Sequence, residues 1–320
     1  MARKPIKRAA DAGHAPAWTE RLFAGERTAI SRAITAVENE TAEARQVHAA
    51  IYPRLGGALV VGVTGAPGTG KSTLTGAYIG ELRRRGRRVG VVAVDPSSPA
   101  SGGALLGDRI RMTEHAADEG VFVRSLAARG HLGGLSLTTA RVVDVLDAAG
   151  KDVIIVETVG TGQSEIEIAG LADVKVVVCA PGLGDEIQAI KAGILEIADI
   201  VVLNKADQPL AERSALQLER MIGAGATPRV LRTTATTGDG VAALADAVEA
   251  RAGAGSAGRA SPRLRARRLI TQAASERVRS ALAGLDDDRL DTLCDALLKG
   301  EIDLAGAAAQ GLALIDRDDD

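Results

Sequence analysis

Residues Ala58–Thr73 read ALVVGVTGAPGTGKST, an apolar run followed directly by a glycine-rich turn and the start of a helical pattern. The run Ala58–Thr64 is short and rich in β-branched residues, which is typical of a strand buried on both faces. Gly65–Ser72 then matches the pattern G-x-x-x-x-G-K-[ST] in full, and helical spacing continues to about Arg85. This order of strand, turn and helix predicts a P-loop, so we expect the chain to bind a nucleoside triphosphate.

The residue types in this turn follow from the chemistry of a phosphate site. Glycines allow the backbone to curl so that successive N–H groups point at phosphate oxygens, and the next helix adds the positive end of its dipole. We expect Lys71 to bridge the β- and γ-phosphates, and we expect the hydroxyl of Ser72 to ligate Mg²⁺.

The composition favours a nucleotide-binding α/β fold. Of 320 residues, 46% are hydrophobic but only 2% are aromatic, so the core must consist mainly of Val, Ile, Leu and Ala. We therefore predict an α/β P-loop NTPase fold with a mostly parallel, doubly wound sheet and helical extensions at the N- and C-terminal ends. The net charge of −2 provides no global basic field that would indicate nucleic acid.

Three parts of the chain differ in pattern. We predict a helical N-terminal extension over residues 1–52, the nucleotide domain over 53–252, and a linker with a C-terminal helical arm over 253–320. Two amphipathic helices are expected in the arm, and their apolar faces need either the nucleotide domain or a second subunit. The N-terminal extension has an apolar stripe at helical spacing, expected to pack on the nucleotide domain, formed by Ile30, Ala33, Ile34 and Val37.

Neither membranes nor nucleic acids are expected as partners. No apolar run reaches the roughly 18 residues that a membrane-spanning helix needs. The arginines at the start of the arm have no aromatic residues between them, which argues against binding single-stranded nucleic acid. Cys179 and Cys294 lie far apart in sequence, so we expect free thiols in a bacterial cytoplasm and regard a mitochondrial matrix as less favoured.

Two aspartates follow the P-loop helix in places that suit a metal ion. Asp95 ends an apolar strand at the sheet edge where ligands collect, so it is a candidate for Mg²⁺, directly or through water. In this Pro/Ser-rich context Asp95 is equally compatible with a helix N-cap or an Asx turn. Asp108 lies in the glycine-studded loop Ser101–Met112, which has the character either of a segment ordered by a γ-phosphate or of an ordinary surface loop.

Another carboxylate follows the apolar run Lys151–Val156. Glu157 precedes Gly160 by three positions, which is the layout of a turn that senses Mg²⁺ and the γ-phosphate. Most GTPases have Asp at this position. The longer side chain of Glu157 has three open roles: direct ligation, ligation through water, or polarisation of the attacking water.

The sequence Asn204-Lys205-Ala206-Asp207 follows a further apolar strand and matches N-K-x-D. A carboxylate accepts hydrogen bonds from both N1–H and the exocyclic amine of guanine, a donor pair that adenine does not offer. A site built on paired hydrogen bonds rejects the wrong base strongly, so the nucleotide is predicted to be GTP. Thr234-Ala235-Thr236 lies where a GTPase usually has a loop that caps the guanine.

Taken in order, these motifs closely resemble those of the MeaB/ArgK family, whose members are GTPase chaperones of adenosylcobalamin-dependent methylmalonyl-CoA mutase. The resemblance extends from about Ala17 to the C-terminal helices and is most specific from Gly62 to Asp207. The segments that carry it are GAPGTGKST, DPSSP, GGALLGDRIRM, ETVGTGQSE and PGLGDEIQAIKAGILEIADIVVLNKAD.

The resemblance implies three sets of site residues. GTP or GDP would be bound by Gly65, Ala66, Pro67, Gly68, Thr69, Gly70, Lys71, Ser72, Thr73, Asn204, Lys205, Asp207, Thr234, Ala235 and Thr236. Mg²⁺ would be held, directly or through water, by Ser72, Asp95, Asp108 and Glu157, and the catalytic set would be Lys71, Asp95, Asp108 and Glu157. A switch segment touching the client would include Asp185, Gln188 and Lys191.

The implied function is that of a GTPase, which hydrolyses GTP to GDP and phosphate. Such a chaperone gates adenosylcobalamin loading and protects or reactivates methylmalonyl-CoA mutase or a related acyl-CoA mutase. The family resemblance also implies a homodimer joined through the C-terminal arm. Two alternatives are a metal-insertion GTPase of the nickel or cobalt type, which needs a compact Cys/His site, and a P-loop kinase, which needs an acceptor pocket and a base.

Overall fold

A computed structural model describes the chain, and the residues that it describes are 18–96, 115, 117–128, 134–158, 170–182, 194–223, 230–253, 262–284 and 287–318. The chain divides into two compact units, Met1–Arg263 and Leu264–Asp320.

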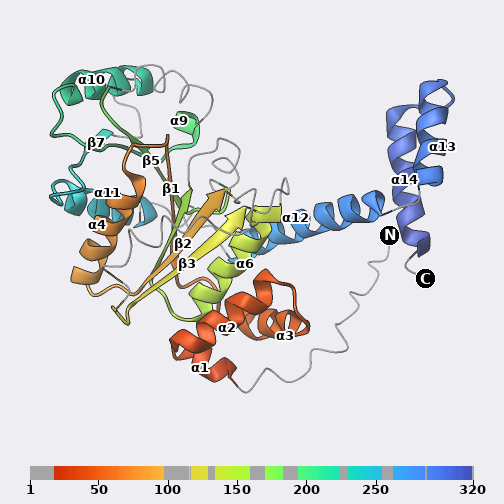
Figure 1. The fold of residues 1–320 in the computed structure, drawn as a ribbon, viewed down its shortest axis with the longest axis horizontal. Coiled ribbons are helices and arrows are strands. Elements are labelled where there is room, and N and C mark those ends of the chain that lie inside the picture. Colours follow the sequence, from red (N-terminus) through yellow and green to blue (C-terminus); the bar gives the residue numbers. More distant parts are fainter. Residues whose placement is uncertain are drawn as a thin grey trace. The chain divides into compact units, whose positions relative to one another are not determined.

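Seven strands form one sheet in the first unit, in the order β3-β2-β4-β1-β5-β6-β7 (Figure 1). Each pair of neighbouring strands is parallel, so the predicted α/β P-loop fold is confirmed. The strands are β1 (Leu59–Thr64), β2 (Val89–Pro96), β3 (Val121–Ala128), β4 (Val153–Thr158), β5 (Val174–Cys179), β6 (Ile200–Leu203) and β7 (Val230–Arg232).

Strand β1 lies in the middle of this sheet, between β4 and β5. All six residues of β1 and all six of β4 are buried, as their apolar sequences predict for strands covered on both faces. The register pairs Val63 of β1 with Glu157 of β4, so Glu157 lies beside the strand end from which the P-loop begins. Parallel strands bring their carboxyl ends to one edge, and the sequence motifs meet at that edge.

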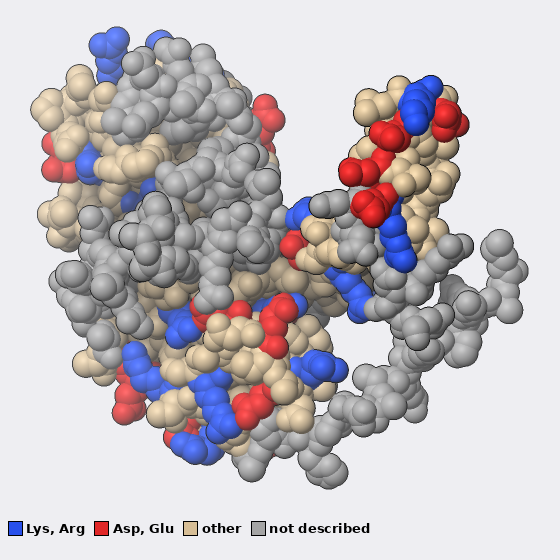
Figure 2. Space-filling view, turned by 45° about the vertical axis from the view of Figure 1, so that its right-hand side comes forward, with Lys and Arg blue, Asp and Glu red and all other residues tan. Residues whose placement is uncertain are grey.

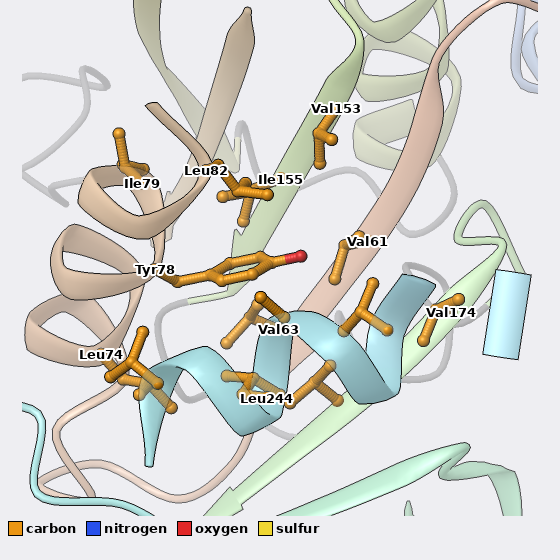
Figure 3. Packing of buried hydrophobic residues seen from close by; sticks show 14 of the residues in the cluster. Val61, Val63, Leu74, Tyr78, Ile79, Leu82, Val153, Ile155, Val174 and Leu244 are labelled. Atoms are coloured by element: carbon orange, nitrogen blue, oxygen red, sulfur yellow. The ribbon is translucent and has the colours of Figure 1, made fainter. Parts of the chain in front are cut away.

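Helices cover both faces of the sheet, which makes it doubly wound (Figure 1). On one face, α4 (Lys71–Arg84) and α11 (Val241–Gly253) pack on alternate residues of the central strands. Figure 3 shows Tyr78 and Leu74 of α4 and Leu244 of α11 against Val61 and Val63 of β1. This aliphatic cluster anchors the helix that follows the P-loop.

On the opposite face, α6 (Gly134–Ala148) covers β2, β3 and β4, and α10 (Ala211–Ile222) packs on β5 and β6. Leu146 of α6 fills the space above Gly90, where an added Cβ would lie 3.1 Å from the Leu146 side chain. A short helix, α9 (Ile194–Ile197), precedes β6.

The N-terminal helices pack on α6 and so form a further layer on that face. They are α1 (Thr19–Phe23), α2 (Arg27–Glu38) and α3 (Ala42–Ile51), followed by the 3₁₀ turn η1 (Tyr52–Arg54). The stripe predicted from spacing is buried, with Ile34 and Val37 fully inaccessible. The chain turns between these helices at Gly25 and Glu40, both with positive φ.

The second unit contains most of α12 (Pro262–Ala283), together with α13 (Asp287–Leu298) and α14 (Leu304–Asp318). The prediction of two helices in the C-terminal arm was therefore incomplete, because α14 is a third. Its sequence LAGAAAQGLALIDRD is rich in Ala, which is the best helix former. Helices α13 and α14 contact each other.

Among the described residues, no helix is both long enough and apolar enough to cross a membrane.

Candidate nucleotide-binding site

The P-loop connects the end of β1 to the start of α4, as predicted from the sequence. Gly70 is the N-cap residue of α4 and has the left-handed conformation, with φ +87°. Gly65 has φ +143°, and a Cβ placed there would lie 2.1 Å from the carbonyl oxygen of Val178 in β5. The backbone of the loop therefore passes directly against the neighbouring strand, and only glycine fits at Gly65.

Lys71 lies at the start of α4 and is 7% exposed. Its ammonium Nζ donates hydrogen bonds to the carbonyl oxygens of Gly65 at 2.6 Å and Ala66 at 2.9 Å. The Ala66 oxygen also accepts from the hydroxyl of Thr69 at 2.9 Å. The loop thus holds the cationic group inside its own curve, where a triphosphate would bind.

Ser72 and Glu157 meet directly beneath the loop. The Ser72 hydroxyl donates a 2.6 Å hydrogen bond to Oε1 of Glu157, and the two residues are 8% and 1% exposed. Between β4 and β1, the Thr158 hydroxyl donates to the hydroxyl of Thr64 at 3.1 Å. A hydroxyl and a carboxylate are hard oxygen donors of the kind that Mg²⁺ prefers, so the chemistry of this pair fits a magnesium ion.

The other predicted metal and switch residues are less fully described. Asp95 is in β2 one residue beyond Val94, which pairs with Thr158, so its backbone lies at the same sheet edge as Glu157. Nothing is described of the Asp95 side chain. Four predicted residues lie outside the described residues, namely Asp108, Asp185, Gln188 and Lys191.

Asn204 joins the P-loop to the loop after β7. Its amide Nδ2 donates to the carbonyl oxygens of Thr69 at 3.0 Å and Gly70 at 3.5 Å. Its Oδ1 accepts from the Thr233 hydroxyl and from the Ala235 backbone N–H, each at 3.1 Å. The side chain is 2% exposed, so this one buried amide fixes three segments relative to one another.

Lys205 provides a second connection to the P-loop. Its Nζ donates to the carbonyl oxygen of Gly68 at 2.7 Å, and its backbone has φ +57°, which is uncommon for a residue other than glycine. The next N–H, of Ala206, donates to the carbonyl oxygen of Thr233. Asp207 is exposed beside this turn, as a group that reads a bound base must be.

Thr234-Ala235-Thr236 begins a tight loop after β7. The N–H of Thr234 donates to the carbonyl oxygen of Asp239, which closes the loop, and Thr234 and Ala235 are 9% exposed. The structure therefore brings the predicted capping segment, Asn204 and the P-loop together. Helix α10 and strand β7 lie between Asp207 and Thr234 in the chain.

Three residues at this site were not predicted from the sequence. Thr233 binds Asn204, and Thr64 and Thr158 bind each other between the strands that support the P-loop and Glu157. Their signal in sequence is weak, because threonine is an ordinary strand residue and only the fold shows which side chain it faces.

The basic cluster RRRGRR at Arg83–Arg88 is largely neutralised. Arg83 pairs with Asp118 at 2.8 Å, Arg84 and Arg85 both pair with Glu81 at 2.7 Å, and Arg87 reaches Glu249 at 3.5 Å. Figure 2 likewise shows basic and acidic side chains interspersed over the described surface. Within the described parts of the chain, no three His, Cys, Asp or Glu side chains are grouped to hold a metal ion.

Comparison with known proteins identifies the family. A sequence profile described as "Methylmalonyl Co-A mutase-associated GTPase MeaB" matches residues 30–285. A Pyrococcus horikoshii protein named as a GTPase is 52% identical over 233 residues, which cover 70% of this chain and 74% of that one. GTPase ArgK of Escherichia coli is 46% identical over 191 residues, which cover 58% of each chain.

A solved structure supports the same assignment. The crystal structure named LAO/AO transport system kinase has a TM-score of 0.66 and 29% sequence identity to this chain, and the match covers 98% of this chain and 100% of that one. The profile match spans both the P-loop and the N-K-x-D motif. The chain belongs to the MeaB family of P-loop GTPases, binds guanine nucleotide and hydrolyses GTP.

Proposed function

We propose that this GTPase serves an adenosylcobalamin-dependent mutase, either methylmalonyl-CoA mutase or a related acyl-CoA mutase. GTP binding and hydrolysis would gate the loading of adenosylcobalamin and would protect or reactivate the mutase. The observation that carries this proposal is the match of residues 30–285 to a family described by its association with methylmalonyl-CoA mutase. The matched span holds both nucleotide motifs, so the association would be controlled by the nucleotide.

Within the site, we propose that Gly65–Thr73 bind the triphosphate and that Lys71 turns from the carbonyl oxygens of Gly65 and Ala66 to the β- and γ-phosphates. Asp207 would read the guanine base, and Asn204 would hold the capping segment Thr234–Thr236 against the P-loop. Discrimination against ATP would come from the carboxylate of Asp207, which adenine would leave unpaired.

Mg²⁺ would be held by Ser72 and Glu157, with Asp95 and Asp108 as further ligands, directly or through water. When bound, the ion supplies positive charge that stabilises the negative charge developing on the phosphoryl oxygens. The protein contributes a carboxylate that is already buried and already oriented by the Ser72 hydroxyl. Such preorganised groups need no rearrangement during the reaction.

Hydrolysis by the isolated protein would be slow. Thr161 and Gly162 separate Gln163 from Gly160, so no glutamine immediately follows the glycine of the phosphate-sensing turn to position the attacking water. We propose that the client mutase orders the segment containing Asp185, Gln188 and Lys191 and thereby completes the site.

The protein would act as a homodimer through its second unit. Leu298 and Leu304, at the junction of α13 and α14, are 85% and 73% exposed. Apolar side chains with this exposure at a helical turn are expected to be covered by a second copy of the chain.

The test is GTP hydrolysis with and without stoichiometric mutase. We expect the mutase to raise kcat at least tenfold for the wild-type protein. Asp207→Asn is the matched control, because it should lose guanine selectivity while leaving the mutase-contacting surface intact. A kcat unchanged by methylmalonyl-CoA mutase, and by a panel of related acyl-CoA mutases, would contradict the proposal. Co-purification of a mutase with protein bound to a non-hydrolysable GTP analogue provides an independent check.

A second candidate arises from the solved relative, which is named as a transport system kinase. A kinase would transfer the γ-phosphate to an acceptor other than water. Incubation with γ-labelled GTP and ATP distinguishes the two. Label only in free phosphate supports the GTPase chaperone, whereas label on a protein or small molecule supports a kinase.

A further inference from the structure

Lys151 is a buried lysine at the end of the sheet opposite the P-loop. It lies two residues before the start of β4 and is 5% exposed. Its Nζ lies 3.4 Å from the carbonyl oxygen of Gly120, and this is its sole hydrogen bond within the described residues. That oxygen already accepts a shorter bond, 2.9 Å, from the N–H of Val89. No carboxylate of the described residues lies within ion-pair distance of Nζ.

Three arginines from different elements surround this lysine. Arg83, near the end of α4, lies over Gly120, where an added Cβ would be 2.1 Å from the guanidinium carbon. Arg88, before β2, lies over Gly150, where an added Cβ would be 3.5 Å from the guanidinium carbon. Arg27 of α2 donates to the carbonyl oxygen of Val121 at 3.3 Å. The cluster therefore gathers four cationic groups at the starts of β2, β3 and β4.

Two carboxylates face the same region. Asp118 takes a bidentate pair of hydrogen bonds from Arg83, at 2.8 and 3.0 Å. Asp152 accepts from the backbone N–H of Arg88 at 2.6 Å, with the Arg88 side chain at 3.6 Å. With Lys151 protonated, four positive groups thus face two negative ones, and the cluster has an excess of two positive charges.

Another lysine on the same edge shows the usual arrangement. Lys175, in β5, pairs with the carboxylate of Asp199 at 2.8 Å, and Arg251 binds the other oxygen of that carboxylate. Among the described residues, Lys151 has no such partner. The pKa of Lys151 is lowered to about 8, mainly by burial and then by the positive charges of Arg88, Arg27 and Arg83. The negative charge of Asp118 raises this pKa by a smaller amount. A substantial fraction of Lys151 is therefore a neutral amine near physiological pH.

We propose that Lys151 takes up carbon dioxide and forms a carbamate. The lone pair of the neutral amine attacks the carbon of CO₂, one C=O electron pair moves to oxygen, and the nitrogen proton leaves to water. The product is an N-carboxylate bearing one negative charge. That charge, added to those of Asp118 and Asp152, balances the three arginines and leaves the cluster neutral. Burial keeps larger electrophiles from the amine, whereas CO₂ is small and uncharged.

The direct test uses the unmodified protein. It is incubated at pH 8 with ¹³C-labelled bicarbonate, alkylated with triethyloxonium to fix any carbamate as its ethyl ester, digested, and analysed by mass spectrometry. We expect a labelled adduct on the Lys151 peptide that increases with bicarbonate and is at least tenfold more abundant than on the Lys175 peptide. A short peptide with a free α-amine, treated in parallel, shows that trapping works. If this peptide is labelled while Lys151 carries no adduct, the proposal is wrong.

A second measurement examines the consequence for stability. The urea midpoint of the wild-type protein at pH 8 should rise with bicarbonate at constant ionic strength, because a carbamate neutralises the cluster. Lys151→Arg keeps the charge but has no amine that is neutral at this pH, so its midpoint should not respond. An equal response in Lys151→Arg would show that bicarbonate acts elsewhere and would refute the assignment, independently of the proposed function.

Discussion

At Gly65 the P-loop passes so close to β5 that no side chain fits. Gly65→Ala would place a methyl group 2.1 Å from the carbonyl oxygen of Val178 at a φ of +143°. We expect a loss of at least about 3 kcal/mol in the free energy of unfolding, since strain and a backbone clash combine. Gly68→Ala is the control. Gly68 also has positive φ, +78°, but no atom lies near its added Cβ, so the loss should be about 1 kcal/mol. Urea denaturation measures the free energy of unfolding of both variants. Equal losses would contradict a close contact between Gly65 and the backbone of Val178.

Glu157 is the residue whose charge the proposed magnesium site requires. Glu157→Gln retains an oxygen that can accept the Ser72 hydrogen bond, so it removes the charge with little structural change. We expect kcat for GTP hydrolysis at saturating Mg²⁺ to fall at least tenfold, about 1.4 kcal/mol in the barrier, while GDP affinity changes little. Thr158→Val, which removes only the hydroxyl pair with Thr64, is the structural control. An unchanged kcat in Glu157→Gln would exclude a role for the carboxylate.

The lowered pKa of Lys151 also predicts that the free energy of unfolding depends on pH, even without CO₂. Its pKa is about 8 in the folded protein and about 10.4 in an unfolded chain. Between these values the unfolded state binds the extra proton, so the free energy of unfolding should rise with pH. Between pH 8 and pH 10.4 in CO₂-free buffer, the free energy of unfolding of the wild type should rise by on the order of 2 kcal/mol relative to that of Lys151→Met. A constant difference across this range would mean that the lysine is not perturbed.

At the scale of elements, local patterns predicted the parts of the nucleotide site but not how they are joined. The strands around Gly65, Glu157 and Asn204 are apolar runs, so their type could be predicted from sequence. The ends were less accurate, because β4 covers Val153–Thr158 and includes Glu157, whereas the predicted run was Lys151–Val156. The order β3-β2-β4-β1-β5-β6-β7 depends on pairings between distant segments, which periodicity does not encode. For the same reason, the N-K-x-D motif did not predict that Asn204 binds Thr233 and Ala235.

Helix α6 is attached to the start of β1 through one buried carboxylate. Asp147, 4% exposed, accepts hydrogen bonds from the backbone N–H groups of Gly56, Gly57 and Ala58, at 2.8, 3.0 and 2.9 Å. Asp147→Ala would leave these donors without that acceptor and should cost about 2–4 kcal/mol of unfolding free energy. Asp246→Ala is the control. Asp246 forms an ion pair with Arg85, but its side chain is 70% exposed, so this pair should contribute less than about 1 kcal/mol to the free energy of unfolding. Comparable losses in urea denaturation would mean that Asp147 is not a structural attachment.

At the scale of the whole molecule, the chain comprises two compact units of different character. The first has a large aliphatic core between a parallel sheet and its helices, which is why its fold followed from composition and motifs. The three helices of the second unit have few fully buried residues, and within its described part only Gly311 is classed as buried. Helices that bury so little by themselves are expected to pack against a partner, and their sequence pattern does not identify that partner.

The exposed leucines of α13 and α14 allow a test of subunit assembly. If these two helices form the dimer contact, a charge at Leu298 or Leu304 should separate the subunits, because each side chain is more than 70% exposed in the single chain. We expect Leu298→Glu combined with Leu304→Glu to sediment as a monomer at micromolar concentrations at which the wild type is a dimer. GTP hydrolysis without mutase should be retained in this variant, since the nucleotide site lies wholly in the first unit.

Leu216→Glu is the matched control, because Leu216 on α10 is also exposed, at 45%, but belongs to the first unit. It should leave the sedimentation coefficient of the dimer unchanged. If the double variant remained dimeric while Leu216→Glu dissociated, the contact would lie on the first unit. The exposed leucines of α13 and α14 would then be available to the mutase, and mutase-stimulated hydrolysis by the double variant would be the measurement that decides it.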